Sequence, residues 1–138
     1  MAIFEWKEEF SINIVEIDEQ HKLMLQHVNV LYEAVLACEN GIGKEGVISA
    51  LKELIEFTKY HFATEEQYMS EHGYPEHELH RQEHIDLVNQ LEELLEIVSI
   101  GIKPNFCNDA DLSNDWVLSH ILGADMKLGI FLNQRNIF

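Results

Sequence analysis

Two pairs of residues in the middle of the chain have the types and the spacing of metal ligands. They lie in the segment HFATEEQYMSEHGYPEHELHRQEH, from His61 to His84, which holds five of the eight histidines and six glutamates. Glu65 follows His61 by four positions, and His84 follows His80 by four. Residues four apart on a helix stand on one face about a turn apart, so each pair can reach one metal ion or two adjacent ions. A solvated acidic helix pair is the alternative, and helical phase decides between the two.

Polar residues that fall on apolar helix faces extend this set. Six of them are in phase with leucine, valine and phenylalanine: His21, His61, Glu65, His80, His84 and His120. A helix bundle would place them in its centre, where an imidazole or a carboxylate is costly to bury unless it is paired or binds metal. Asp125 is the candidate for a second carboxylate. It follows His120 by five positions, about 140° around an ideal helix, so periodicity alone does not favour it over Asp115. Gly123, between them, could permit a local distortion.

The ligand types narrow the choice of metal. Five imidazoles and two carboxylates exclude Ca²⁺ and Mg²⁺, which prefer oxygen donors, and a cysteine-type structural zinc site would need thiol ligands. Imidazole combined with carboxylate suits iron, zinc, copper or nickel. Seven ligands are too many for one tetrahedral ion but suit two ions, one with an open position. Glu65 can then bridge the two ions through its two oxygens.

Four amphipathic stripes must position these residues. The first follows an N-terminal arm, starts at Asp18 and extends to Cys38, and the others cover residues 47–69, 80–98 and 116–132. Pro75 lies in the break between the second and third stripes, and the polar interval 99–115 is expected to be a loop. We therefore predict an all-α protein. Its architecture is an antiparallel up-down-up-down four-helix bundle with an N-terminal arm, in a single domain covering residues 1–138.

The composition limits the partners and the compartment. A formal charge of −16 opposes binding to phosphate groups, so we expect neither nucleic acid nor a membrane as a partner. No apolar run approaches the roughly 18 to 20 residues of a membrane span. The N-terminus MAIFEWKEEF lacks the features of a signal peptide, so we expect a cytoplasmic protein. Cys38 and Cys107 are expected to be reduced thiols, and Glu66 and Glu71 are expected at the surface.

Four segments of the sequence resemble the hemerythrin family, in particular its single-domain bacterial members, the bacteriohemerythrins. The segments are IDEQHK around His21, HFATEE from His61, GYP followed by HRQEH, and WVLSHILGAD ending at Asp125. The resemblance covers nearly the whole chain. It implies reversible dioxygen binding at a non-haem di-iron centre, for oxygen storage or delivery to oxygen-requiring enzymes, rather than catalysis. It further implies NO or small anions such as azide as possible ligands, and a monomer or weak oligomer.

The resemblance also assigns the ligands. One iron would be held by His80, His84 and His120, and the other by His21 and His61. Glu65 and Asp125 would bridge both ions beside an oxo or hydroxo group, and the spacing of five between His120 and Asp125 is the family's own. The iron with two histidines would keep the open position for dioxygen.

Reversible binding requires that water be kept away, so we expect an apolar pocket. The candidates that flank the ligands are Met24, Phe62, Trp116, Val117 and Ile121, for which ordinary core packing is the alternative role. Asn13 stands where many relatives have glycine, and it also tolerates a left-handed backbone. Met24 stands where relatives often have leucine. Because a thioether can be oxidised to the sulfoxide, Met24 raises the hypothesis of faster autoxidation or some peroxidase-like turnover.

Three alternative functions were weighed. HRQEH matches the H-x-x-E-H pattern of inverted zinc peptidases, with Glu83 as general base, but it accounts for only two of the buried ligands. A ferritin-like di-iron oxidase would use Glu-x-x-His pairs, and no histidine in this chain has a glutamate three residues before it. An O2 or NO sensor remains open, although no transmitter segment accompanies the domain.

Overall fold

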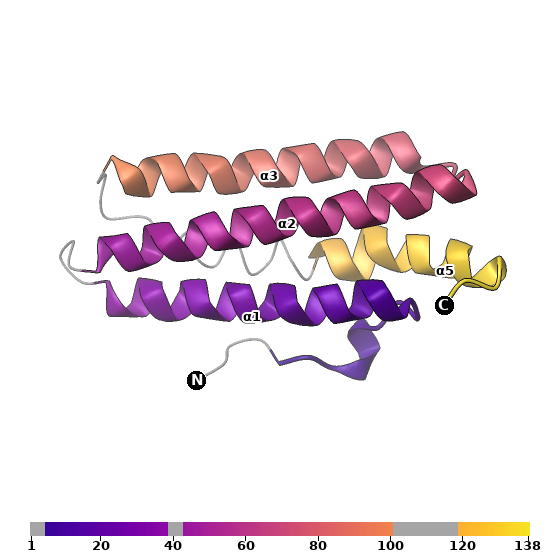
Figure 1. Ribbon diagram of the computed structural model, residues 1–138, viewed down its shortest axis with the longest axis horizontal. Coiled ribbons are helices and arrows are strands. Elements are labelled where there is room, and N and C mark those ends of the chain that lie inside the picture. The colour runs from indigo at the N-terminus through magenta and orange to yellow at the C-terminus, as the bar shows by residue number, and fades with distance from the viewer. Residues whose placement is uncertain (1–4, 39–42, 101–118) are drawn as a thin grey trace.

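The computed structural model describes residues 5–38, 43–100 and 119–138. A short 3-10 turn, η1 (Glu8–Phe10), precedes α1 (Val15–Ala37), α2 (Lys44–His72) and α3 (His77–Ser99). The last helix contains a π-helical turn, η2 (Ile121–Asp125), followed by α5 (Met126–Gln134). Figure 1 shows α1, α2, α3 and α5 lying side by side and alternating in direction. The predicted all-α antiparallel four-helix bundle is therefore confirmed, while the expected polar loop 99–115 falls mostly outside the described residues.

The turn between α2 and α3 follows from its sequence, HGYP. Gly73 ends α2 in the left-handed conformation, with φ 64°, and its N–H donates to the carbonyl of Met69. The N–H of Tyr74 also donates to that carbonyl, at 3.0 Å. Glycine adopts this conformation without the steric cost that other residues meet, and Pro75 cannot continue a helix. The short turn therefore keeps the two pairs of candidate ligands on adjacent antiparallel helices.

The first helix begins at Val15, three residues before the predicted start at Asp18. The Asp18 side chain instead accepts hydrogen bonds from the hydroxyl of Ser11 and from the N–H of Ile12, the latter at 2.9 Å. Asp18 thus ties the N-terminal arm to the first turn of α1. Asn13 has φ 59°, which agrees with the expectation that it tolerates a left-handed backbone.

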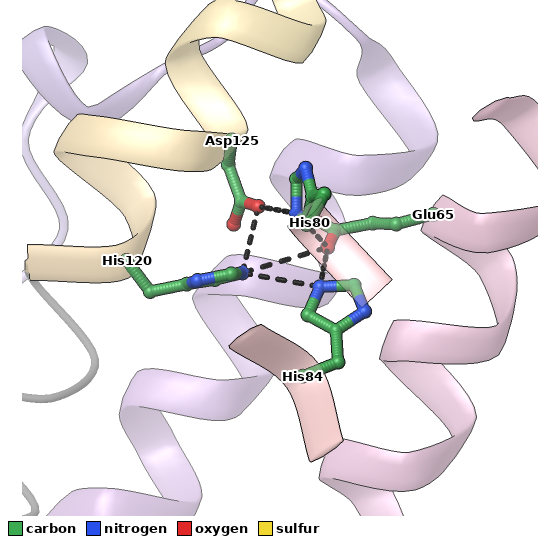
Figure 2. A group of neighbouring side chains, drawn as sticks. All are labelled: Glu65, His80, His84, His120 and Asp125. Carbon is green, nitrogen blue, oxygen red and sulfur yellow. Dashed lines mark hydrogen bonds and ion pairs between the residues drawn. The ribbon is translucent and has the colours of Figure 1, made fainter. Parts of the chain in front are cut away.

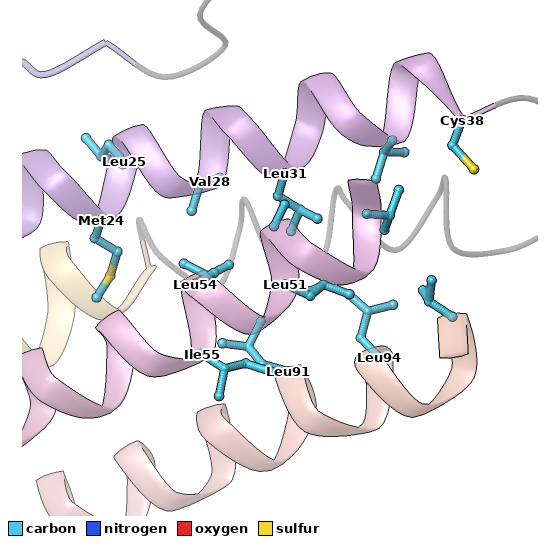
Figure 3. Close-up of a cluster of buried hydrophobic side chains, with 14 of the residues drawn as sticks. Met24, Leu25, Val28, Leu31, Cys38, Leu51, Leu54, Ile55, Leu91 and Leu94 are labelled. Carbon is cyan, nitrogen blue, oxygen red and sulfur yellow. The ribbon is translucent and has the colours of Figure 1, made fainter. Parts of the chain in front are cut away.

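Buried apolar side chains form two separate clusters. The larger one joins α1, α2 and α3 (Figure 3) and also includes Phe10 of η1 and Ile121 of η2. The smaller one joins the N-terminal arm and the first turn of α1 to the end of α2 and to α5. Along α1, Ile17 belongs to the smaller cluster and Met24 to the larger, with His21 between them. Among the described residues, no helix is long and apolar enough to cross a membrane.

Candidate metal centre

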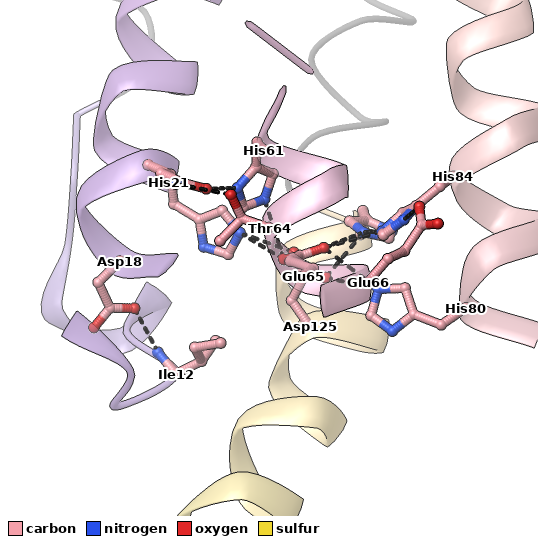
Figure 4. Close-up of polar contacts among 12 residues, drawn as sticks. Ile12, Asp18, His21, His61, Thr64, Glu65, Glu66, His80, His84 and Asp125 are labelled. Carbon is pink, nitrogen blue, oxygen red and sulfur yellow. Dashed lines mark hydrogen bonds and ion pairs between the residues drawn. The ribbon is translucent and has the colours of Figure 1, made fainter. Parts of the chain in front are cut away.

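The seven predicted ligand side chains converge in the interior of the bundle, between the two apolar clusters. Each is at most 5% exposed. They come from all four helices (Figures 2 and 4), in two groups that share Glu65 and Asp125. In each group, the potential ligand atoms lie within 4.8 Å of one another. We call these the three-histidine group, with His80, His84 and His120, and the two-histidine group, with His21 and His61.

The two shared carboxylates each direct one oxygen toward each group. Glu65 Oε1 lies 3.0 Å from His84 Nε2, whereas Glu65 Oε2 lies 3.1 Å from His61 Nε2. Asp125 Oδ1 lies 2.9 Å from His120 Nε2, whereas Asp125 Oδ2 lies 2.8 Å from His21 Nε2. The carboxylates therefore stand between two clusters of imidazole nitrogens.

The π-helical turn explains how Asp125 reaches the site. The N–H of Met126 donates to the carbonyl of Ile121, five residues back, so this turn holds one residue more than a turn of α-helix. His120 immediately before the turn and Asp125 at its end can then face the same centre, despite their spacing of five. A Cβ added at Gly123 would meet nothing within 4 Å, so the turn does not need glycine for space.

The buried carboxylates demand positive charge, and in the metal-free chain the imidazoles supply it as protons. Burial lowers the pKa of His21 and of His80, but the nearby carboxylates of Asp125 and Glu65 outweigh it and raise both pKa values to about 9. Burial likewise lowers the pKa of His120, yet the charge of Asp125 raises it well above its ordinary value. Burial raises the pKa of Glu65, but the surrounding imidazoles, His61 first, bring it well below the usual range. Burial and the charge of Glu65 raise the pKa of Asp125, but the imidazoles, His120 first, outweigh them and lower it below the usual range.

Several of these atoms approach one another without being hydrogen bonded. Both oxygens of Glu65, the Oδ2 of Asp125 and the Nε2 atoms of His21 and His61 are buried and have no hydrogen-bond partner among the described residues. Buried polar atoms are normally satisfied. The candidate ligand atoms of each group lie within 4.8 Å of one another, and imidazole with carboxylate is a donor set that suits iron. The residues therefore fit a pair of metal ions.

Outer hydrogen bonds orient three of the five imidazoles. His61 Nδ1 lies 2.7 Å from Gln20 Oε1, His84 Nδ1 lies 2.9 Å from Glu66 Oε2, and His120 Nδ1 lies 2.7 Å from Glu83 Oε1. With Nε2 directed inward to ligate, Nδ1 carries the proton and donates it outward.

These outer partners were missed in the sequence. Glu66, expected at the surface, is instead partly buried, with a side chain that is 29% exposed. One feature of the sequence could have identified them: Gln20, Glu66 and Glu83 each stand next to a candidate ligand in the chain.

Three of the five pocket candidates lie in the described part of the chain. Met24, Phe62 and Ile121 are at most 3% exposed and belong to the larger apolar cluster. The Phe62 ring stacks on the His84 imidazole with 3.7 Å between centroids and 4° between planes. Trp116 and Val117 lie outside the described residues.

Fold and site together define a four-helix bundle with two interior groups of side chains that could hold metal ions. Residues 13–129 match the family described as the hemerythrin HHE cation binding domain, and the chain belongs to the hemerythrin family. It is 30% identical over 131 residues to the bacteriohemerythrin of Methylococcus capsulatus, covering 94% of this chain and 96% of that one. The myohemerythrin of Theromyzon tessulatum is 25% identical, covering 90% of this chain and 89% of its own.

A solved structure agrees with this assignment. The crystal structure of a wild-type hemerythrin superimposes with a TM-score of 0.83 at 29% identity, covering 93% of this chain and 96% of that chain. The family binds dioxygen at a di-iron site. The resemblance found in the sequence is therefore confirmed for the family and for the fold.

Proposed function

We propose that this protein binds dioxygen reversibly at two iron ions held by the seven buried side chains. The observation that carries the proposal is the placement of Glu65 and Asp125, each of which offers one oxygen to the three-histidine group and the other to the two-histidine group. Two carboxylates placed in this way can bridge a pair of ions, together with an oxo or hydroxo group. When bound, a pair of ferrous ions would supply dioxygen with two electrons, one from each ion, in a transfer that can be reversed.

The two groups are unequal in ligand number, and this supports a division of roles. The three-histidine group offers five protein ligands when the shared carboxylates are included, and the two-histidine group offers four. An ion held by the two-histidine group would therefore keep the open position for dioxygen. NO or a small anion such as azide would enter at the same position.

Apolar packing keeps water from this position. Met24, which lies one helical turn after His21, and Phe62, which directly follows His61, are both buried in the larger apolar cluster. Ile121 joins them from the last helix. Exclusion of water disfavours release of a reduced oxygen species and so favours return of dioxygen to solution. We infer a carrier, active in oxygen storage or delivery in the cytoplasm, rather than an enzyme.

Metal analysis combined with optical spectroscopy under controlled oxygen tests the proposal. The purified protein should contain two irons per chain, and its ferrous form should gain visible charge-transfer bands in air and lose them when oxygen is removed. Glu65→Gln should abolish the bands, whereas Glu71→Gln, an exposed neighbour on α2, should leave them unchanged. Zinc in place of iron after growth and reconstitution with iron would overturn the proposal. Steady oxygen consumption with a reductant would instead indicate an oxidase.

A further inference from the structure

The hydrogen bonds behind the ligand histidines place negative charge on one side of the centre. His84 and His120, both in the three-histidine group, donate to the carboxylates of Glu66 and Glu83. In the two-histidine group, His61 donates to the neutral amide of Gln20. The Nδ1 atoms of the remaining ligands, His21 and His80, have no hydrogen-bond partner among the described residues.

The Gln20 contact is fixed as an amide-oxygen contact by a second hydrogen bond. The Gln20 side chain donates through Nε2 to the hydroxyl of Thr64 at 3.2 Å, so its oxygen faces His61. Gln20 is 6% exposed, and its amide oxygen is the hydrogen-bond partner of His61 Nδ1 in the part of the chain that the structure describes. The difference between the two groups is therefore one of charge as well as of ligand number.

A carboxylate behind an imidazole makes that imidazole a stronger donor and favours the higher charge on the metal it binds. Both glutamates are placed to act in this way. Glu83 Oε1 accepts from His120 Nδ1 at 2.7 Å, with a side chain that is 45% exposed. Glu66 accepts at 2.9 Å with a partly buried side chain. Arg81 Nε lies 3.7 Å from its other oxygen but is half exposed, so it offsets only part of the charge.

We propose that Glu66 and Glu83 lower the reduction potential of the ion in the three-histidine group, so that the two ions of the centre are electronically unequal. The proposal rests on the di-iron function proposed above. In the Fe³⁺/Fe²⁺ couple, one electron is exchanged with a mediator, and the ion backed by two carboxylates loses its electron first. The ion of the two-histidine group, which has the open position, is the one kept ferrous. Glu66 and Glu83 are positioning residues, because they act through the imidazoles.

The test is an anaerobic spectroelectrochemical titration of the iron-loaded protein with single charge-neutralising variants. Glu66→Gln and Glu83→Gln keep an oxygen that can accept from Nδ1, so they isolate the charge. Each should raise the lower of the two midpoint potentials by about 59 mV, which corresponds to a tenfold change for a one-electron couple. Gln20→Glu should lower the higher potential, a shift of opposite sign at the other ion.

Two acidic residues on the same helices provide matched controls. Glu71 on α2 and Asp86 on α3 are exposed and accept from Gln67 and Gln82 rather than from a ligand. Glu71→Gln and Asp86→Asn remove the same charge and should leave both potentials within error. Shifts in the controls equal to those of Glu66→Gln and Glu83→Gln, or no shift in any variant, would overturn the inference.

A second measurement separates this inference from the proposed function. If the wild-type chain binds zinc and not iron, the oxygen-carrier function fails, but the role of the carboxylates can still be measured. The rate at which a chelator extracts Zn²⁺ should then rise about tenfold in Glu66→Gln and Glu83→Gln, and not in the controls. Equal extraction rates in the wild-type chain, the two glutamate variants and the two controls would overturn this inference, whatever the outcome for the oxygen-carrier function.

Discussion

Metal loading should release about three protons from the ligand histidines. The perturbation is the addition of Fe²⁺, or of Zn²⁺ as a redox-inert substitute, to the metal-free protein. In that state the buried carboxylates hold His21, His80 and His120 in their protonated forms. A metal ion binds only the deprotonated imidazole, so each of these protons must leave.

The magnitude follows from the pKa values. At pH 7.5, groups with a pKa of about 9 are almost fully protonated, which gives nearly one proton each from His21 and His80. His120, whose pKa is also raised well above the ordinary value, contributes a third. Ionisation of a bridging water would add a further proton. Apparent metal affinity should therefore fall steeply as the pH is lowered below about 9.

The same shifts predict how the stability of the metal-free protein depends on pH. The folded-state pKa of His21 and of His80 lies above the value of about 6.5 for an unfolded chain. Their contribution is therefore fully present below pH 6.5 and is lost as the pH rises through 9. We expect the Tm of the metal-free protein to fall between pH 6.5 and 9. The Tm of the metal-loaded protein should change less, because metal ions have replaced the protons.

Isothermal titration calorimetry in two buffers with different ionisation enthalpies counts the protons directly. His72→Gln, which removes an imidazole outside the centre, should release the same number as the wild-type chain, whereas His80→Gln should release about one fewer. Release of less than one proton per metal pair, or a metal-free Tm that rises from pH 6.5 to 9, would refute this reasoning.

Three further predictions concern the surroundings of the site. Gly129→Ala would place a Cβ 2.5 Å from the Ile12 carbonyl oxygen. The steric clash should outweigh the gain in helix propensity and lower the free energy of unfolding by about 1–2 kcal/mol. Urea denaturation measures this difference. Gly123→Ala is the control, because its Cβ meets nothing within 4 Å; equal stability of the two variants would contradict the packing. Asn13→Ala should lower the free energy of unfolding by about 1 kcal/mol, because residue 13 has a φ of 59°, whereas Asn13→Gly should not lower it. Equal losses of stability in the two variants would show that backbone strain is not the cause. Met24→Leu should slow autoxidation of the oxygenated protein and remove sulfoxide at this position in mass spectra; an unchanged rate would end the hypothesis of thioether oxidation.

Helical phase was enough to find six of the seven candidate ligands but not Asp125. His21, His61 and Glu65 were identified because each interrupts an apolar stripe, and all three are fully buried. Asp125 could not be assigned from α-helical periodicity, because the turn that brings it inward is a π-helix. The resemblance to the hemerythrin family supplied the assignment of Asp125, which helical periodicity could not give.

Sequence analysis did not predict two other features, and the physical reasons differ. Glu66 and Glu83 look like the many other glutamates on the outer surface, and only their contacts with His84 and His120 distinguish them. The start of the first helix was misplaced because Asp18, a common residue at helix starts, caps nothing at its own position. Its carboxylate reaches back to the arm instead.

The position of the site within the bundle explains why so polar a centre can be accommodated. On α2, His61 and Glu65 lie between Ile55 of the larger apolar cluster and Met69 of the smaller one. On the last helix, Asp125 lies in the same way between Ile121 of the larger cluster and Leu128 of the smaller one. The polar layer therefore interrupts the core once, and each apolar cluster remains continuous on its own side. Without metal, the buried carboxylates are neutralised by protonated imidazoles, whose pKa values are raised. The polar layer is thus set by the sequence, and metal ions bound there would replace the protons of the imidazoles.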